Sequence, residues 1–303
     1  MTTLKLALDW TPNVNHLGFL VAKERKFYQE AGIDLELVDP REENYTVTPG
    51  KKVELDQVDF AIAPFETVIS LNNKTNVVPV QAVFAILQKD LSCIATLATS
   101  GIERPAQLDG KTYASYKARY EDRIVQRMVM NDGGTGALEW SYPEKLGIWN
   151  TLLTGEADAT WIFDNWEGVE AARKGVNLRK FSLSDFGIPY GYSPIVLAKT
   201  AQISAKKEAY TAFAQATKKG FLYSQKHPEE AAEILGKYVT DYDREHIDLL
   251  RTVQVTSAHF GTEEHCGRME SQRVEEFLNW LVENELEGEQ ILKQSLYTNA
   301  LLF

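Results

Sequence analysis

The chain has 303 residues, and its 44% hydrophobic and 25% charged residues are ordinary proportions for a soluble globular protein. This length allows two compact lobes, each with its own hydrophobic core. The net charge of −11 at pH 7 argues against a nucleic-acid-binding protein, because the chain as a whole repels a polyanion.

The cysteines and the N-terminus bear on the cellular compartment. Cys93 and Cys266 form no CxxC pair and no zinc-binding spacing, so we expect two reduced thiols, with one disulfide as the alternative. The first residues lack the basic and apolar stretches of a signal peptide, and no window has the apolar length of a membrane span. We therefore expect a cytoplasmic protein without a membrane segment. If a signal segment had been removed from this chain, we would instead expect a periplasmic or lipid-anchored protein.

Strand and helix patterns alternate along most of the chain. Residues 4–10 alternate as a strand does, and residues 15–32 carry apolar side chains at helical spacing up to Gly32. We predict further strands at 33–39, 58–64, 77–85, 92–99, 108–116, 157–163, 177–183 and 193–200. We predict further helices at 66–74, 118–133, 165–175, 206–227, 228–239, 243–253 and 270–284. This alternation predicts an α/β architecture with a mostly parallel sheet.

Four loops combine polar and aromatic side chains at the ends of predicted strands. In open α/β sheets, ligands bind beyond the carboxyl ends of the strands. The sequence therefore predicts that the ligand site is built from the loops at residues 9–16, 64–67, 115–123 and 163–168.

The first of these loops, at residues 9–16, reads "DWTPNVNH". Trp10 offers a flat apolar face and Asp9 accepts hydrogen bonds, so the pair suits a planar heteroaromatic ring with an exocyclic amine. Asn13 and His16 are further candidate ligand-binding residues. The alternative is structural: Asp9 or Asn15 caps the helix, Trp10 packs at a rim, and His16 supports the fold.

The second loop, at residues 64–67, leads straight into a helix. Pro64, Phe65, Glu66 and Thr67 are candidate ligand-binding residues, because the first-turn N–H groups of that helix can face a ligand. The alternative is that Thr67 caps the helix and Glu66 complements the helix dipole.

The third loop, at residues 115–123, carries two basic residues before a helix. Its candidate ligand-binding residues are Ser115, Tyr116, Lys117, Arg119 and Tyr120. Free amides at a helix start bind anions, and Lys117 and Arg119 add positive charge, so we predict contact with a phosphate or carboxylate. The loop is not a Walker motif. The alternative is a solvated basic turn that pairs with the two acidic residues directly after it.

The fourth group is aromatic and includes residues from a later segment. Asp164, Trp166, Tyr190 and Tyr192 are the candidate ligand-binding residues, with Trp161, Phe163 and Glu167 nearby in the sequence. As a set at predicted strand ends they look like the walls of a closing cleft, with Asp164 as a hydrogen-bond acceptor. The alternative for each aromatic side chain is a place in the core.

The sequence lacks the common catalytic and metal-binding motifs. It contains no GxSxG, HExxH or GxGxxG pattern. The nearest metal candidate is the group His259, His265 and Cys266, whose spacing matches no standard metal site. We therefore expect neither a metal nor a cofactor.

Several segments, taken in order, resemble the NMT1/THI5-like family. These are "FYQEAGIDLELV", "VDFAIAP", "LDGKTYASY" and "LLTGEADATWIF", and the resemblance covers most of residues 3–235. That family comprises periplasmic-binding-type proteins for thiamine pyrimidines, alkanesulfonates, taurine or nitrate, together with the fungal thiamine-pyrimidine synthase. The opening "LDWTPNVNH" is most similar to the thiamine-pyrimidine branch.

The resemblance implies a fold of two α/β lobes, of the type II periplasmic-binding kind, with the ligand in a cleft between them. Residues 1–93 and 197–303 would form lobe I, and residues 94–196 would form lobe II. The chain would cross between the lobes twice, near Cys93 and near Pro194.

The sequence departs from the fungal synthase at three places. The resemblance aligns Ala63 and Thr67 with the synthase's lysine and histidine, and "YGYSP" at 190–194 with its cysteine-rich iron motif. The matches that remain, the Trp10 loop and the loop at 115–120, favour pyrimidine binding over synthesis.

The leading hypothesis is therefore a protein that binds a thiamine-related aminopyrimidine, with or without a phosphate, for thiamine pyrimidine salvage or biosynthesis. The ring would stack on Trp10 and on an aromatic residue of the Tyr190 and Trp166 group. Asp9 and Asp164 would accept the amine hydrogens. The residues Ser115, Lys117 and Arg119 would hold an anionic substituent.

Two alternatives come from other functional classes. One is a cytoplasmic synthase of the thiamine pyrimidine (HMP phosphate) that lacks the fungal lysine, histidine and cysteine-rich motifs, with His16 as the candidate catalytic residue. The other is an ABC-transporter-type receptor for a sulfonate or another small anion. An ABC transporter would be a partner only if the protein is exported.

Overall fold

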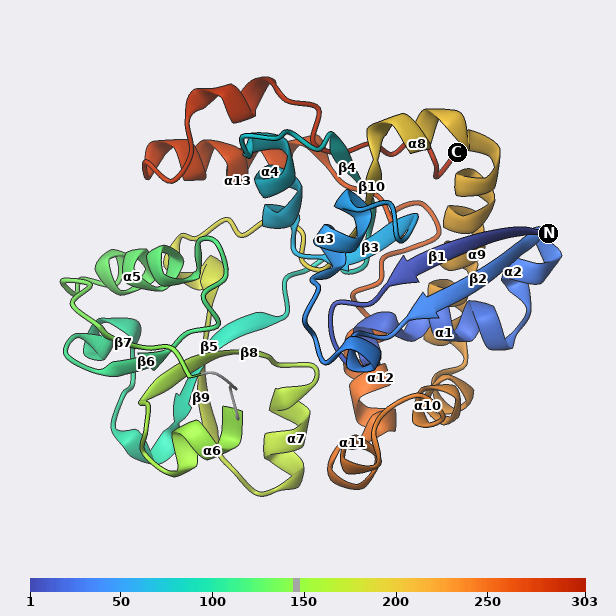
Figure 1. Cartoon of the computed structure of the whole chain (residues 1–303). Coiled ribbons are helices and arrows are strands. Elements are labelled where there is room, and N and C mark those ends of the chain that lie inside the picture. Colours follow the sequence, from blue (N-terminus) through green and yellow to red (C-terminus); the bar gives the residue numbers. More distant parts are fainter. Residues whose placement is uncertain (144–147) are drawn as a thin grey trace.

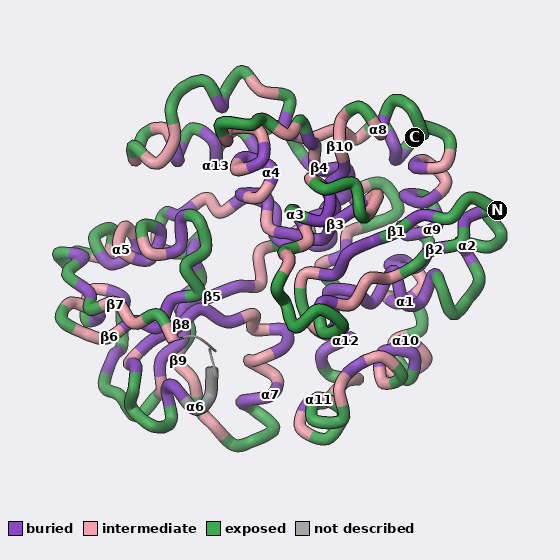
Figure 2. The backbone as a smooth tube through the Cα atoms, in the orientation of Figure 1, coloured by how far each residue is buried: buried purple, intermediate pink, exposed green. Residues whose placement is uncertain are grey.

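Two five-stranded sheets, each flanked by helices, form two lobes (Figure 1). The structure, a computed structural model, describes residues 1–143 and 148–303, with the side chains of the second segment described from Thr151 onward. Figure 2 shows buried strands at the centre of each lobe and more exposed helices around them. The two-lobed α/β architecture predicted from the sequence is confirmed.

The sheet of lobe I has the strand order β2-β1-β3-β10-β4. Its strands are β1 (Thr2–Ala7), β2 (Ile33–Val38), β3 (Phe60–Ala63), β4 (Val80–Ala85) and β10 (Ile195–Lys199). Strand β1 pairs in parallel with β2 and β3, whereas β10 runs antiparallel between β3 and β4.

The sheet of lobe II has the strand order β7-β6-β8-β5-β9. Its strands are β5 (Ser92–Leu97), β6 (Thr112–Ala114), β7 (Glu139–Ser141), β8 (Ala159–Phe163) and β9 (Leu178–Ser182). Strand β6 pairs in parallel with β7 and β8, whereas β5 runs antiparallel between β8 and β9. The short strand β7 was missing from the sequence prediction.

The prediction of a mostly parallel sheet was wrong, because both sheets are mixed. Strands β5 and β10 are the ones by which the chain enters one lobe from the other, and both are antiparallel to their neighbours. A parallel pair needs a crossover connection, usually a helix, whereas a strand that arrives directly from the other lobe enters its sheet from the opposite end. The predicted lobe boundaries, after residues 93 and 196, fall within β5 and β10.

The helices pack on both faces of the sheets, and the C-terminal third of the chain is mostly helical. In the first half they are α1 (Leu17–Glu24), α2 (Phe27–Glu30), α3 (Pro49–Glu54), α4 (Phe65–Asn73), α5 (Glu121–Asn131) and α6 (Ile148–Leu153). The remaining helices are α7 (Glu167–Arg173), α8 (Thr200–Ala205), α9 (Lys207–Lys226), α10 (Pro228–Gly236), α11 (Asp241–His246), α12 (Leu249–Ser257) and α13 (Ser271–Glu283).

The single helix predicted at 243–253 is two helices. The chain breaks between α11 and α12 because Asp248 accepts a hydrogen bond from the backbone N–H of Arg251 at 2.9 Å and so caps a new helix. The apolar periodicity of the sequence continues across this cap, so it predicted a single helix.

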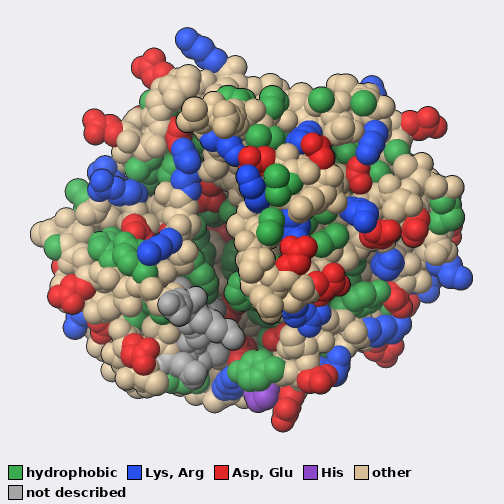
Figure 3. Space-filling model, viewed as in Figure 1, with side chains coloured by type: hydrophobic (Ala, Val, Ile, Leu, Met, Phe, Trp, Pro, Cys, Tyr) green, Lys and Arg blue, Asp and Glu red, His purple; other side chains and the backbone are tan. Residues whose placement is uncertain are grey.

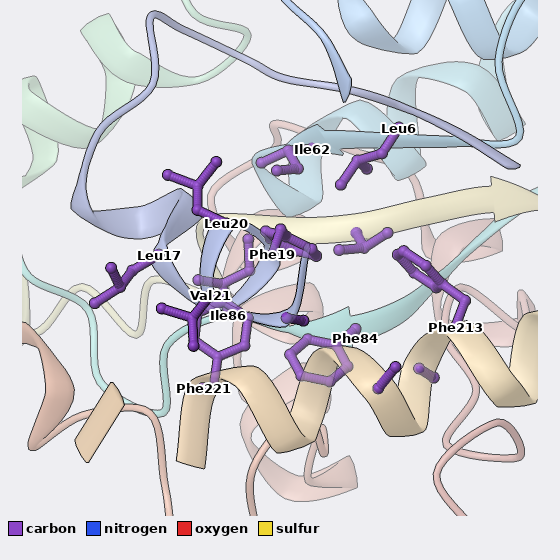
Figure 4. Packing of buried hydrophobic residues seen from close by; sticks show 14 of the residues in the cluster. Leu6, Leu17, Phe19, Leu20, Val21, Ile62, Phe84, Ile86, Phe213 and Phe221 are labelled. Carbon is purple, nitrogen blue, oxygen red and sulfur yellow. The ribbon is translucent and has the colours of Figure 1, made fainter. Parts of the chain in front are cut away.

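Helix α1 is fixed against lobe I by close packing on α9. Phe19 of α1 and Phe84 of β4 both contact the ring of Phe221 on α9, with centroids 5.3 and 5.7 Å apart (Figure 4). At the crossing, a Cβ on Gly220 would collide with the carbonyl oxygen of Gly18, so both helices need glycine there. Because α1 directly follows the loop at residues 9–16, this packing also holds that loop in place.

One arginine of α13 joins the two segments that connect the lobes. The Arg273 side chain donates to the carbonyl oxygen of Gln88 at 2.6 Å and to that of Gly191 at 3.1 Å. Its guanidinium also lies over the ring of Tyr192, 4.1 Å from the centroid. Arg273 therefore fixes the two crossings relative to each other.

Candidate functional site

The candidate site is the groove between the two lobes, which is open on the face shown in Figure 3 and has hydrophobic and acidic side chains on its walls. Contacts across the groove show that the loops after β1 and β8 face each other. The side-chain amide of Asn165, after β8, donates to Asn15 of the first loop at 3.0 Å and to Thr256 of α12 at 3.1 Å. The strand-end rule therefore placed these loops at the junction of the lobes.

In the first loop, His16 positions Asp9. The fully buried imidazole of His16 accepts a hydrogen bond at Nδ1 from the backbone N–H of Asn13 at 3.1 Å. Its Nε2 therefore carries the proton and donates to Oδ1 of Asp9 at 2.7 Å. Asn13 completes the turn by accepting from the N–H of Asn15 at 2.9 Å. Both ring nitrogens of His16 are thus engaged, and its catalytic role stays a prediction.

Trp10 of the same loop is half exposed, at 51%, and it is free to offer one ring face to a ligand. Its partner is Tyr45, whose ring centroid lies 5.1 Å away at an interplanar angle of 45°. Tyr45 has a left-handed backbone with φ of 58°, which is uncommon for a tyrosine. Sequence analysis missed Tyr45, since no motif marks it.

In the second loop, Glu66 is a buried carboxyl group at the start of α4. It is 4% exposed, and the Tyr190 hydroxyl donates to its Oε1 at 3.0 Å. Burial raises the pKa of Glu66 to about 7, against the smaller opposing effect of the Tyr190 hydrogen bond. The Tyr190 ring lies edge-on to Trp161, with centroids 5.4 Å apart. A protonatable group and two aromatic rings therefore meet where the lobes join.

The neighbours of Glu66 in the second loop are structural. Pro64 occupies the N-cap position of α4 without a side-chain hydrogen bond, so Thr67 does not cap the helix. The Thr67 methyl group instead packs where α3 approaches at Gly50. The buried Phe65 donates its backbone N–H to the carbonyl of Tyr192 at 3.2 Å.

Three backbone amides of the third loop, those of Tyr116, Lys117 and Ala118, donate to side chains of the loop and of α5. The backbone N–H groups of Tyr116 and Ala118 donate to Oε2 of Glu121 at 2.9 and 3.2 Å. The hydroxyl of Ser115 accepts from the N–H of Lys117 and donates to Asp122 at 2.6 Å. A carboxylate of the chain therefore occupies the place that the sequence assigned to an external anion.

The charged side chains of that loop also have partners. The Lys117 ammonium lies over the Tyr142 ring, 4.5 Å from its centroid. Arg119 and the Tyr120 hydroxyl both donate to Glu287 of lobe I, at 3.0 Å from Arg119 Nε and 2.6 Å from the hydroxyl. The predicted role of Ser115, Lys117 and Arg119 in anion binding stays a prediction. The alternative named Glu121 and Asp122 as partners of the basic side chains, whereas these carboxylates bind backbone amides and Ser115, and Arg119 pairs with Glu287.

The fourth group is dispersed by the structure. Asp164 pairs with Lys180 at 2.6 Å, Trp166 packs into the core of lobe I at 7% exposure, and Tyr192 is buried beneath Arg273. Only Tyr190 of the predicted set reaches Glu66. The Trp166 ring holds α7 of lobe II against lobe I.

Two more titratable side chains of lobe II, Glu167 and Tyr116, lie close enough to interact electrostatically. Glu167 accepts from the backbone N–H of Phe163 at 2.9 Å, and burial raises its pKa to about 7. Desolvation, followed by the charges of Glu167 and Glu121, raises the pKa of Tyr116 well above its usual value. The junction of the lobes is therefore acidic and aromatic.

Sites for metals and membranes were also considered. Within the residues that the structure describes, no three His, Cys, Asp or Glu side chains converge as metal ligands would. Cys93 and Cys266 are buried free thiols. None of the described helices is long and apolar enough to cross a membrane.

With this geometry established, the chain can be compared with known proteins. Residues 13–231 match the family model described as NMT1/THI5 like, which is more than half of the chain. The chain belongs to the NMT1/THI5-like family. The resemblance predicted from the sequence is therefore confirmed.

Two curated relatives of this family member have related names. The formylaminopyrimidine-binding protein of Halalkalibacterium halodurans is 24% identical over 291 residues, covering 93% of this chain and 85% of the relative. The 4-amino-5-hydroxymethyl-2-methylpyrimidine phosphate synthase of Legionella pneumophila is 26% identical over 243 residues, covering 78% and 74%.

Solved structures show the same fold. The alkanesulfonate-binding protein SsuA of Xanthomonas axonopodis pv. citri, bound to MOPS, superposes with a TM-score of 0.71. The match covers 98% of both chains at 12% identity, so it establishes the fold alone. The predicted periplasmic-binding architecture of two lobes is thus confirmed for this member of the NMT1/THI5-like family.

Proposed function

We propose that this member of the NMT1/THI5-like family binds a thiamine-related aminopyrimidine between its lobes and serves thiamine pyrimidine salvage or biosynthesis. The family, and a relative named as a formylaminopyrimidine-binding protein, support this function. The chemistry of the groove supports it independently.

The observation that carries the proposal is the buried Glu66 beside Tyr190 and Trp161. An aminopyrimidine is flat and has an amine donor next to a ring nitrogen that accepts. A carboxyl group with a pKa of about 7 can accept from the amine and, when protonated, donate to the ring nitrogen. Aromatic rings next to that group suit the faces of the same ligand.

The opening loop supplies the second contact region. Asp9 keeps a partly exposed carboxylate, which His16 holds in place, and Trp10 keeps an exposed indole beside it. An indole stack contributes about 0.5–1.5 kcal/mol beyond burial of area, and a charge-assisted hydrogen bond about 1.5–3 kcal/mol. Two such contact regions, after the neighbouring parallel strands β1 and β3, together with burial of the ligand's apolar area, are compatible with micromolar binding.

We propose that the ligand is not phosphorylated. The amides of the third loop already bind Glu121, and Arg119 already pairs with Glu287. A phosphate there would displace a buried carboxylate and would meet an acidic surrounding. The same argument weighs against a sulfonate or another small anion as the ligand.

A synthase of the thiamine pyrimidine is the second candidate, because the Legionella relative carries that name. His16 argues against it, since neither ring nitrogen is free to transfer a proton or react. The cytoplasmic location expected from the N-terminus stays a prediction.

The test is isothermal titration calorimetry with 4-amino-5-hydroxymethyl-2-methylpyrimidine and its formylaminopyrimidine analogue. We expect saturable binding of at least one of them, and roughly tenfold or greater weakening in Glu66→Gln. The matched control is Glu103→Gln, an exposed carboxylate remote from the groove, which should leave the affinity unchanged. Folded protein that binds neither compound would refute the proposal. Growth of a thiamine-pyrimidine auxotroph that depends on this protein and on His16 would favour the synthase.

A further inference from the structure

A second cavity lies at the junction of the lobes, outside the groove described above. Its volume is about 510 Å³, and it is enclosed by α5 of lobe II and by α13 with the turn that follows it in lobe I. Figure 1 shows α13 lying across the end of lobe II that carries α5. This volume is in the range of pockets that hold small metabolites.

One wall of the cavity is basic. Arg123 and Arg127 line it at i, i+4 spacing and so lie along one side of α5, and Arg119 lines it just before that helix begins. Arg119 pairs with Glu287, and within the described residues Arg123 donates to Gln126 alone, at 2.8 Å. Among the described residues, neither Arg123 nor Arg127 has a carboxylate partner.

This concentration of positive charge is unusual in a chain with a net charge of −11. Like charges at i, i+4 repel, and carboxylates are abundant enough to pair with every arginine. The acidic residues that begin α5 are engaged elsewhere, because Glu121 binds loop amides and Asp122 accepts from Ser115 and Tyr142. The guanidinium groups of Arg123 and Arg127, which have no carboxylate partner among the described residues, are therefore available to an anion.

The opposite wall of the cavity is apolar and amide-bearing. Trp280 and Leu286 line it, together with Asn284 and Glu285, and Glu285 is the one acidic lining residue among the described residues. Guanidinium groups bind phosphate in a bidentate manner, while an indole and aliphatic side chains bind an apolar or aromatic group.

We propose that this cavity is a second ligand site, which binds a small phosphorylated or diphosphorylated molecule with an aromatic or apolar part. Arg123 and Arg127 hold the phosphate, and the Trp280 side of the cavity receives the rest of the molecule. The occupant contacts both lobes. The site is separate from the aminopyrimidine groove, and it does not depend on the function proposed for that groove.

The test is calorimetric titration of the full chain with inorganic diphosphate. We expect one saturable site, which Arg123→Gln combined with Arg127→Gln weakens roughly tenfold or more. Lys218→Gln combined with Lys219→Gln is the matched control, because it removes equal charge from the surface of α9, and it should change the affinity less than about twofold. Glu285→Gln removes a repelling charge from the lobe I wall and should tighten binding roughly twofold.

Three results would overturn the proposal. They are the absence of saturable binding to the unaltered protein, equal weakening by the arginine and lysine pairs, and an arginine pair that binds as well as the unaltered protein. Thermal melts followed by circular dichroism establish that each variant is folded. Titrations of the same variants with the aminopyrimidine distinguish the two sites. If the protein binds diphosphate but not the aminopyrimidine, only the function proposed for the groove is refuted.

Discussion

Glu66 and Glu121 occupy equivalent places in the two lobes but differ in how their oxygens are used. Each begins a helix that follows a strand, and both are almost fully buried, at 4% and 3% exposure. Glu121 accepts from the Tyr113 hydroxyl and from the backbone N–H groups of Tyr116 and Ala118. Within the described chain, Glu66 accepts from one other residue, Tyr190.

The difference separates a structural carboxylate from one that can bind a ligand. Burial raises the pKa of both carboxyl groups, to about 7 for Glu66, and in Glu121 the hydrogen bonds from Tyr116, Tyr113 and Ala118 to the charged form oppose it. A buried carboxyl group with unused acceptor positions can make a further hydrogen bond when a ligand arrives. The comparison teaches that burial alone does not mark a functional residue.

The largest effect is expected from Glu121→Ala. This change leaves two loop amides and the buried Tyr113 hydroxyl without their acceptor, which should lower the free energy of unfolding by about 2–4 kcal/mol. Urea unfolding followed by circular dichroism measures it. A loss below about 1 kcal/mol would show that the loop amides do not depend on Glu121, and the comparison would fail.

The next effect concerns the pH dependence of stability. Burial raises the pKa of Glu66 from 4.5 to about 7 in the native state, so the native state keeps a proton that the unfolded state has lost between these values. Stability therefore falls as pH rises through this window. From pH 5 to pH 8, the unaltered protein should lose about 2–3 kcal/mol more than Glu66→Gln. Parallel pH profiles of the two proteins in urea unfolding would contradict the raised pKa.

The smallest effect compares the exposed aromatic residues of the two lobes. Trp10→Ala should leave stability within about 0.5 kcal/mol, because the side chain is half exposed, yet weaken aminopyrimidine binding roughly tenfold and remove much of the ligand-induced tryptophan quenching. The control is Tyr142→Ala, since Tyr142 is similarly exposed, and its recorded contacts, with Lys117 and Asp122, lie within lobe II. Equal losses of affinity in both variants would remove the distinction between the lobes.

Local patterns predicted much of the fold and named the loops of the candidate site. Strands, the α1 helix and the loop containing Asp9 and Trp10 follow from alternation, helical spacing and the strand-end rule. Glu66 was also found this way, because it follows a buried strand directly. Parallel pairing was overestimated, since the sequence does not show which strands carry the chain from one lobe to the other.

The missed features depend on residues far apart in the chain. Glu287 pairs with Arg119, which lies 168 positions away in the sequence. Asn165 donates a hydrogen bond to Asn15, which lies 150 positions away. No periodicity links such pairs, so the basic turn was predicted to have free donors. Trp166 was predicted as a cleft wall because an aromatic side chain at a strand end has the same sequence signature whether it faces a ligand or the neighbouring lobe.

The position of Arg273 has a mechanical consequence. One guanidinium holds both connecting segments, so any swing of one lobe against the other turns about that point, and displacements grow with distance from it. Trp280 lies seven residues further along the same helix, a lever of about 10 Å. A displacement of the far end of α13 therefore acts on the two segments that connect the lobes.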